Sequence, residues 1–382
     1  MTGATGALGR RLACEVLRQS EASLVVLSRC SPASATPADF VRHYLPTVGG
    51  VVGRVQVVHG DVTVDGIGIP AGLSEKLQCR VTTIIHAAAV TRFDQSLAFC
   101  RAVNVRGTAN VLQWAGSCRR LTRFALLSTP YVAGRRVGTI LESELAHEKG
   151  FANTYEQSKY EAEIEAERWW HELPLAVYRT STVLGDAGDG QVDRFTAPHF
   201  AFRLLWTGMA PMFPGRMDCP IDLIPGDYAA RATVWLLLGR FKPQARFHIA
   251  AGPRASLPVG RLIDQAYEIF GHLDPEWARR GYAKPPAVDA ETYALFRNSV
   301  MRTANPLYRR VLEQLDSFSE QLLTPKAFDI ANVLAELPDY EEQMPRIESY
   351  LPEVLRFCVH HDWKPGFGGR GAAALREREA LS

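Results

Sequence analysis

Three glycines at the very start of the chain constrain its fold more than any other feature. Gly3, Gly6 and Gly9 are evenly spaced in the segment Thr2-Gly3-Ala4-Thr5-Gly6-Ala7-Leu8-Gly9, and the helix-like run 10–17 follows directly. In a dinucleotide-binding turn such glycines allow a tight bend, a close approach of the backbone to a pyrophosphate, and close packing of a helix on a sheet. The N–H groups at the helix start then face the negative charge of the ligand. The segment therefore predicts a phosphate-binding turn that leads into a helix.

The turn begins at residue 2, so the apolar strand that normally precedes it is absent from the sequence. That strand lies at the centre of a dinucleotide-binding sheet, and its two neighbours would lose backbone hydrogen-bond partners without it. We therefore expect either that the natural gene begins upstream of Met1, or that a chain starting at Met1 binds its dinucleotide poorly and is unstable.

The composition is that of a soluble globular protein. With 382 residues, 47% hydrophobic and 22% charged, the chain can bury one large core or two smaller ones. A formal charge of +2 does not favour nucleic-acid binding by bulk electrostatics. The seven cysteines are scattered without a CxxC pair, which argues against a disulfide framework or a zinc site. No signal peptide or membrane-spanning run is recognisable, so we expect a cytoplasmic protein with free thiols and no bound metal.

Short apolar runs alternate with helical patterns through roughly the first two thirds of the chain. The runs are apolar throughout, as expected of strands that are covered on both faces. Alternating strands and helices predict a Rossmann-type doubly wound α/β fold with a parallel sheet whose first strand is missing. The expected strands are 23–28, 55–59, 82–86, 123–128 and 175–179, with helices notably at 104–115 and 155–172.

After about residue 255 the pattern changes. Helices are expected at 259–270, 290–303, 307–322 and 350–360, with no strong strand between them, and prolines punctuate the region. We therefore expect a dinucleotide-binding domain over 1–255 with a substrate-region insertion at about 186–220, a helical region over 256–364, and a flexible tail over 365–382.

Tyr155 and Lys159 suggest a catalytic pair. Residues four apart share one face of a helix, so the ammonium can lie near the phenol. We expect its charge to lower the pKa of Tyr155 from the usual value of about 10, which makes the phenol a usable acid or base. The pattern alone is common, and a surface aromatic beside a solvated lysine would give the same letters.

Two hydroxyl residues, Ser128 and Thr129, follow the strand expected at 123–128. Ligands of open α/β sheets bind at such strand ends, and a hydroxyl there can stabilise an oxyanion. The alternative is an ordinary turn or capping role. The order of glycine turn, strand-end hydroxyls and Tyr-Lys pair favours an active site.

Taken together, the motifs resemble the extended branch of the short-chain dehydrogenase/reductase superfamily. The matching segments are Thr2–Gly9, Gly60-Asp61-Val62, His86-Ala87-Ala88-Ala89, Asn104-Val105-Arg106-Gly107-Thr108 and Tyr155–Lys159. The resemblance implies that Tyr155 is the catalytic acid/base, that Lys159 binds the nicotinamide ribose, and that Thr129, or alternatively Ser128, contacts the substrate. It also implies a set of cofactor-binding residues: Gly3, Thr5, Gly6, Ala7, Leu8, Gly9, Asp61, Val62, Ala87, Ala88, Ala89, Asn104, Tyr155 and Lys159.

The expected cofactor is NADP(H). An acidic residue about 20 residues beyond the glycines would bind the ribose 2′-hydroxyl of NAD, but that place holds Ser28-Arg29-Cys30. Arg29 can pair with a 2′-phosphate, and Arg10 can reach the same region. The alternative is that Arg29 is a solvated loop residue.

Within the extended branch, the chain is most similar to thioester reductases and fatty acyl reductases, the male sterility type. The supporting segments are 150–163, 178–186, 221–228 and 247–252. The resemblance implies NADPH-dependent reduction of an acyl thioester, on coenzyme A or a carrier protein, to an aldehyde that a second hydride could convert to an alcohol. The basic stretch from Arg119 to Arg123 could dock an acidic carrier protein or the phosphate of a pantetheine, or be a solvated face. Two alternatives remain open: an enzyme acting on a nucleotide sugar or steroid-like alcohol, and a non-catalytic NADP-binding protein.

Overall fold

The computed structural model describes residues 1–29, 36–93, 95–302, 309, 312, 316, 319 and 322–364, and its core is a parallel sheet. Strands follow the order β11-β6-β4-β3 on one side and β1-β2 on the other. Thr2 joins the two parts through parallel bridges to Leu27 of β1 and His86 of β3. The strands are β1 (Leu24–Ser28), β2 (Val55–His59), β3 (Thr83–His86), β4 (Arg123–Ser128), β6 (Leu175–Thr180) and β11 (Ala245–Ile249).

The first two residues lie between β1 and β3. The Thr2 N–H donates to the Ile85 carbonyl at 3.0 Å, and the Leu27 N–H donates to the Met1 carbonyl at 2.9 Å. Met1 and Thr2 thus act as backbone partners to both neighbouring strands, directly before the glycine turn.

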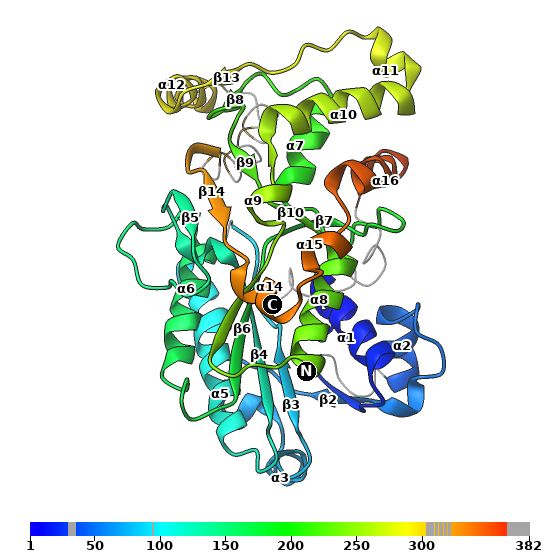
Figure 1. The fold of residues 1–382 in the computed structure, drawn as a ribbon, viewed down its shortest axis with the longest axis vertical. Coiled ribbons are helices and arrows are strands. Elements are labelled where there is room, and N and C mark those ends of the chain that lie inside the picture. Colours follow the sequence, from blue (N-terminus) through cyan, green and yellow to red (C-terminus); the bar gives the residue numbers. More distant parts are fainter. Residues whose placement is uncertain are drawn as a thin grey trace.

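Helices cover both faces of the sheet (Figure 1). One face packs against α3, α5 and α6, and the other against α1 and α8, each around a separate hydrophobic core. This confirms the predicted doubly wound α/β fold. The helices of this part are α1 (Ala7–Gln19), α2 (Pro37–Tyr44), α3 (Ala71–Gln78), α4 (Leu97–Cys100), α5 (Gly107–Gly116), α6 (Thr154–Glu167) and α8 (Gly226–Gly239).

A second group of helices stands above the carboxyl ends of the strands, at the top of Figure 1. Its core joins residues from the middle and the end of the chain, such as Phe202, Phe270 and Leu351, which are almost completely buried. Its helices are α7 (Ala197–Trp206), α10 (Val259–Leu273), α11 (Pro275–Arg279), α12 (Ala290–Met301) and α16 (Ile347–His360). Short strands accompany it: β8 (Phe213–Pro214), β9 (Pro220–Ile221), β12 (Leu257–Pro258) and β13 (Ala287–Val288).

Part of the region after residue 255 returns to the sheet. Strand β14 (Lys326–Phe328) pairs in parallel with β5 (Gly138–Ile140). Phe328 and Val333 are buried in the same core as α1 and α8. The sequence indicated no strong strand here, because β14 has only three residues and its partner lies far away in the chain. The remaining elements are β7 (Thr182–Gly185), β10 (Leu223–Pro225), α9 (Gly252–Ala255), α14 (Ala331–Glu336) and α15 (Tyr340–Gln343).

The helix ends differ from their predicted positions. The helix expected at 104–115 begins at Leu97, and its middle, Arg101–Arg106, is a π-helical turn between α4 and α5. The helix expected to reach residue 172 ends at Glu167, because the following backbone closes into tight turns such as Trp170 N–H to the Glu167 carbonyl. Most of the helix expected at 307–322, and the tail at 365–382, lie outside the described residues.

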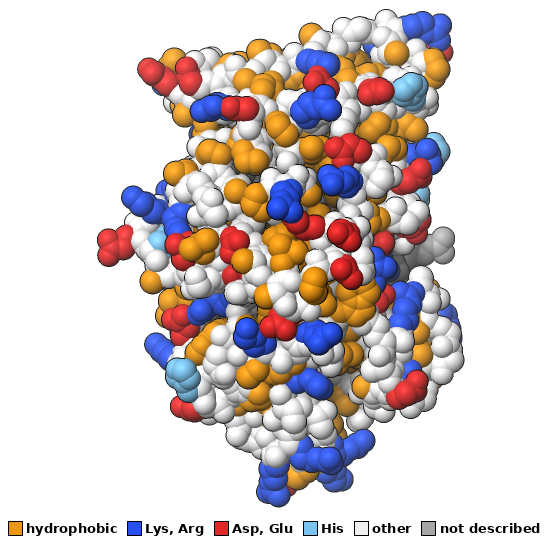
Figure 2. Space-filling view, in the orientation of Figure 1, with side chains coloured by type: hydrophobic (Ala, Val, Ile, Leu, Met, Phe, Trp, Pro, Cys, Tyr) orange, Lys and Arg blue, Asp and Glu red, His pale blue; other side chains and the backbone are white. Residues whose placement is uncertain are grey.

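Positive and negative side chains are mixed over the face shown in Figure 2. No helix among the described residues is both long and apolar enough to cross a membrane.

Candidate active site

The glycine turn packs tightly between β3 and α1. Gly3 has a left-handed backbone conformation (φ 71°), and a Cβ atom there would lie 2.5 Å from the Ala88 nitrogen. A Cβ atom on Gly9 would lie 1.9 Å from the Gly3 carbonyl oxygen. Only glycine therefore lets α1 begin this close to the turn. Since α1 starts at Ala7, its unpaired N–H groups lie at the turn and would stabilise a phosphate.

The other predicted cofactor residues lie around this turn, at the carboxyl ends of the strands. Thr5 and Gly6 are exposed, and Ala7 and Leu8 are half-buried. Arg29 is exposed directly after β1, while Asp61 and the buried Val62 follow β2. The Asp61 carboxylate accepts the Thr63 N–H at 2.8 Å, so it is held in a local turn. Ala87, Ala88 and Ala89 are half-buried after β3. Their arrangement fits a dinucleotide that crosses this edge of the sheet.

The two hydroxyls after β4 have different partners. Ser128 is buried, and its hydroxyl donates to the Glu163 carboxylate. Thr129 is a hydrogen-bond partner of the Tyr155 side chain, and its Oγ1 also accepts the Tyr131 N–H at 3.3 Å. Successive residues of a strand point to opposite faces, which separates the two hydroxyls. The geometry therefore places Thr129, and not Ser128, beside the Tyr155 phenol.

Tyr155 has a raised pKa, which is the opposite of the sequence expectation. Burial raises the pKa of Tyr155 to about 12, and the hydrogen bond with Thr129 offsets only part of this effect. The nearby ammonium does not reverse it, because Lys159 Nζ donates to the Leu127 carbonyl at 2.7 Å instead. The predicted lowering is therefore wrong, since desolvation disfavours the phenolate. At neutral pH the phenol is protonated and can act as a proton donor.

Lys159 is 4% exposed beneath the end of β4. Burial lowers the pKa of this ammonium to about 8, and the charge of Glu163 opposes that shift. Glu163 lies one helical turn further along α6 and also accepts from Arg179 Nη2 at 2.8 Å. The Arg179–Glu163 pair is almost completely buried. This pair was not predicted from the sequence, although an arginine within an apolar strand indicates a buried charge that needs a partner.

Asn104, in the π-helical turn, is hydrogen-bonded to the loop after β3 and to α6. Its Nδ2 donates to the Val90 carbonyl at 3.0 Å and to Ser158 Oγ at 2.9 Å, while its Oδ1 accepts the Val90 N–H at 2.8 Å. These bonds join the loop after β3 to the helix that carries Tyr155 and Lys159. Such π-helical turns are frequent at functional sites.

His86 links the glycine turn to α5 from below. Its Nδ1 lies 2.7 Å from Thr2 Oγ1, and its Nε2 lies 3.1 Å from Thr108 Oγ1. Burial, with the nearby positive charge of Lys159, lowers the pKa of His86 to about 3. This histidine is therefore neutral at physiological pH and holds the turn in place.

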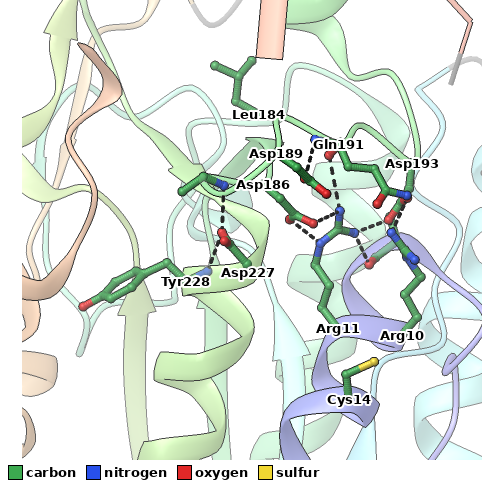
Figure 3. Close-up of polar contacts among 12 residues, drawn as sticks. Arg10, Arg11, Cys14, Leu184, Asp186, Asp189, Gln191, Asp193, Asp227 and Tyr228 are labelled. Carbon is green, nitrogen blue, oxygen red and sulfur yellow. Dashed lines mark hydrogen bonds and ion pairs between the residues drawn. The ribbon is translucent and has the colours of Figure 1, made fainter. Parts of the chain in front are cut away.

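Arg10 is engaged in an ion pair that the sequence did not indicate. Its guanidinium pairs with both carboxylate oxygens of Asp193, and Arg11 bridges Asp186 and Asp193 (Figure 3). Both arginine side chains are 9% exposed. Asp186 and Asp193 belong to the segment that connects β7 to α7, at the start of the predicted insertion. The segment between β7 and α7 is thus held by ion pairs to the first turn of α1, next to the glycine turn.

The basic stretch lies at the opposite edge of the sheet. Arg119 and Arg120 are exposed, and Arg123 is the first residue of β4, whereas Thr129 follows the last. A strand of this length spans about 20 Å, so these arginines are not part of the site.

The chain is similar to several known proteins. The family described as "Male sterility protein" matches residues 1–233. The fatty acyl-CoA reductase wat of Drosophila melanogaster is 25% identical over 207 residues, 47% of this chain and 40% of that protein. The isonitrile lipopeptide synthase of Streptomyces coeruleorubidus is 28% identical over 309 residues, 78% of this chain and 20% of that protein. The chain therefore spans less than half the length of either relative.

Solved structures share the fold. The terminal R domain of the myxalamid PKS-NRPS pathway superposes with a TM-score of 0.75 at 20% identity, covering 96% of this chain and 91% of that one. The UDP-glucuronic acid 4-epimerase of Bacillus cereus, in complex with NAD, superposes with a TM-score of 0.64 at 18% identity, covering 95% and 98%. At these identities the likeness concerns the fold.

Proposed function

Because the chain belongs to the male sterility protein family, we propose that it is an oxidoreductase that reduces an acyl thioester with a nicotinamide dinucleotide. The observation that carries this proposal is the assembly of Thr129, Tyr155 and Lys159 at the carboxyl end of β4, beside the glycine turn. The name of the fatty acyl-CoA reductase points to coenzyme A as the thioester carrier. A thiolation-reductase di-domain from an archaeal non-ribosomal peptide synthetase, which shares the fold with a TM-score of 0.71 at 19% identity and covers 95% of this chain and 75% of that chain, points to a thiolation domain as the alternative carrier.

Thr129, Tyr155 and Lys159 would each have a separate role in the reduction. A nicotinamide dinucleotide held at the glycine turn would supply the hydride for the carbonyl carbon of the thioester. Thr129 and Tyr155 donate hydrogen bonds to the carbonyl oxygen, where negative charge develops, and the proton of Tyr155 completes the hemithioacetal. Breaking its carbon–sulfur bond, with the hydroxyl proton passing to the sulfur, releases a thiol and leaves an aldehyde. A second reduction would give an alcohol.

Lys159 would hold the nicotinamide ribose, since its buried ammonium lies below Tyr155 on the same helix. NADP(H) is the proposed cofactor, because Arg29 rather than a carboxylate follows β1 at the place where the adenosine ribose would lie. Arg10 can contribute to that site only by leaving its ion pair with Asp193.

The test is an assay of NADPH and NADH oxidation against acyl-CoA thioesters, acyl-carrier thioesters and nucleotide sugars. We expect turnover with thioesters and NADPH, and its loss in Tyr155→Phe with NADPH affinity retained. Turnover of nucleotide sugars alone would select the epimerase-like alternative. Binding of NADPH without turnover of any carbonyl substrate would indicate a non-catalytic protein.

A further inference from the structure

Thr129 is followed by a short 3-10 helix, which we call the Pro130–Ala133 turn. Thr129 caps this turn, because its backbone is extended and its Oγ1 accepts the Tyr131 N–H at 3.3 Å. A threonine hydroxyl can donate its proton and accept at two lone pairs. Since the Tyr131 N–H occupies a lone pair, the Thr129 proton stays available for Tyr155 or for a substrate oxygen. The place of the turn therefore sets the direction of this hydrogen bond.

The Tyr131 side chain connects the turn to two distant parts of the chain. Its ring meets the Phe328 ring edge to face, with centroids 5.3 Å apart and an interplanar angle of 82°. Its hydroxyl accepts a hydrogen bond from Thr182 Oγ1 at 3.2 Å. Phe328 ends β14, which lies beside β5 (Figure 1), and Thr182 begins β7. Two strands from later parts of the chain thus hold the side chain whose N–H caps onto Thr129.

The other end of the turn is fixed by contacts of its own. His147 Nε2 donates to the Val132 carbonyl at 2.8 Å. Gly134 follows the turn with a φ of 58°, and a Cβ atom there would lie 2.1 Å from the Gly150 carbonyl oxygen. Tyr131 supplies the corresponding contacts at the end next to Thr129.

We infer that Tyr131 is a positioning residue: its contacts with Phe328 and Thr182 hold the Pro130–Ala133 turn so that the Thr129 hydroxyl points at the reacting carbonyl. This inference rests on the proposed function for its role in turnover. An oxyanion donor must lie about 3 Å from the place where the charge develops. A displacement of about 1 Å can lower the rate by about 10²-fold. Tyr131 would therefore act on kcat through Thr129.

Tyr340 provides a matched control, because it is a tyrosine of the same hydrophobic core. Its ring packs on Tyr228 with centroids 5.3 Å apart, and its hydroxyl donates to the Ala250 carbonyl at 2.8 Å. Leucine at position 131 or 340 removes a packed ring and a hydrogen bond, so both variants should be less stable in urea unfolding. Only Tyr131→Leu should change the site.

The first experiment needs no substrate. The protein is labelled with fluorotyrosine, and the Tyr155 signal is assigned in fluorine NMR by its loss in Tyr155→Phe. Thr129→Val should shift this signal, because the hydrogen bond between Thr129 and Tyr155 is lost. Tyr131→Leu should shift it in the same direction, and the double variant no further than Thr129→Val alone. Tyr131→Phe, which keeps the ring on Phe328, and Tyr340→Leu should leave it in place.

The second experiment is a double-mutant cycle on turnover. Tyr131→Leu should lower kcat by about 10- to 100-fold, with the thioester KM and the NADPH affinity unchanged within about twofold. Tyr131→Phe should recover most of kcat. In the Thr129→Val background Tyr131→Leu should lower kcat no further, since both changes remove the same hydrogen bond.

If Tyr131→Leu does not fold, Phe328→Leu removes the partner ring instead and should lower kcat in the same Thr129-dependent way. Additive losses of kcat in the cycle would overturn the inference, and so would an unmoved Tyr155 signal in Tyr131→Leu. A raised KM with unchanged kcat would also overturn it, because Tyr131 would then be a substrate contact. If no thioester is turned over, the proposed function fails, while the fluorine signal still decides the inference.

Discussion

At the scale of single residues, the candidate site depends on how two adjacent hydroxyls at the end of β4 are separated. Ser128 satisfies the buried Glu163 carboxylate, and Thr129 meets Tyr155. The sequence could place both at a strand end, but it could not choose between them. That choice depends on Glu163, which reaches the strand from α6.

Replacing these two hydroxyls should have different consequences. Thr129→Val should lower kcat by about 10²- to 10³-fold, the usual effect of removing one oxyanion donor. Ser128→Ala should instead lower the free energy of unfolding by about 1–3 kcal/mol, since it removes a hydrogen bond from a buried carboxylate. Steady-state kinetics and urea unfolding of both variants measure the two effects. A large loss of kcat in Ser128→Ala with normal stability would reverse the assignment.

The pKa of Tyr155 shows why residue spacing alone cannot predict the electrostatics of the site. The spacing of Tyr155 and Lys159 correctly places both on α6 near β4. The direction of the pKa shift, however, depends on burial and on where the ammonium points, and neither follows from the spacing.

At the scale of elements, the glycine turn and its helix were predicted well because the constraint is local. The close approach of Gly9 to the Gly3 carbonyl lies within one turn of chain, so the spacing of glycines already encodes it. The ion pairs between the segment 186–193 and α1 were not predicted, because the acids lie more than 170 positions from the arginines that they bind.

Gly9→Ala should therefore damage the turn. A Cβ atom at 1.9 Å from a backbone oxygen forces α1 away from the turn, so we expect at least a tenfold loss of NADPH affinity, about 1.4 kcal/mol, and a lower melting temperature. Gly72→Ala in α3 is the matched control, because nothing lies within 4 Å of its Cβ position. It should be neutral or stabilising by up to about 1 kcal/mol. Unchanged NADPH affinity in Gly9→Ala would contradict this reading of the turn.

The segment 186–193, which is ion-paired to α1, allows a second comparison of two variants. Asp193→Asn removes the carboxylate that both Arg10 and Arg11 contact, and should lower the free energy of unfolding by about 1.5–3 kcal/mol. Asp189 is exposed and its side chain accepts the Gln191 N–H, so the effect of Asp189→Asn should stay within about 0.5 kcal/mol. Urea unfolding of the pair measures the difference. Equal free energies of unfolding in the two variants would show that the ion pairs of Asp193 contribute little to stability.

At the scale of the whole molecule, the parallel sheet and its two helical layers followed from the alternation of apolar strands and helices. The return of the chain to the sheet at β14 did not, since a three-residue strand carries almost no pattern of its own. Three histidines are buried and hydrogen-bonded to other segments of the chain. They are His86 in β3, which contacts Thr2, His199 in α7, which contacts Leu184, and His248 in β11, which contacts Asp329.

Because these histidines are buried, we expect the free energy of unfolding to fall at acidic pH. Burial lowers the pKa of His86 and His248 to about 3 and that of His199 to about 4, against an ordinary value of 6.5. The folded state therefore stays unprotonated while the unfolded state binds protons, so stability falls as the pH drops below about 6.5. Each histidine adds up to about 1.4 kcal/mol per pH unit to this slope.

His199→Gln isolates one of the three contributions. His199 donates from Nε2 to the Leu184 carbonyl and accepts at Nδ1 from the Thr196 N–H, which a glutamine amide can imitate in part. The variant should lose about 1.4 kcal/mol per pH unit of slope between about pH 6 and about pH 5 in urea unfolding. An unchanged slope would mean that His199 protonates freely in the folded state.

The most direct test of the whole account is the stoichiometry of thiol release against NADPH oxidation with an acyl thioester. We predict one thiol per NADPH if the aldehyde is the product and one thiol per two NADPH if the alcohol is, with both processes lost together in Tyr155→Phe. Thiol release without NADPH oxidation, or turnover unaffected by Tyr155→Phe, would contradict it.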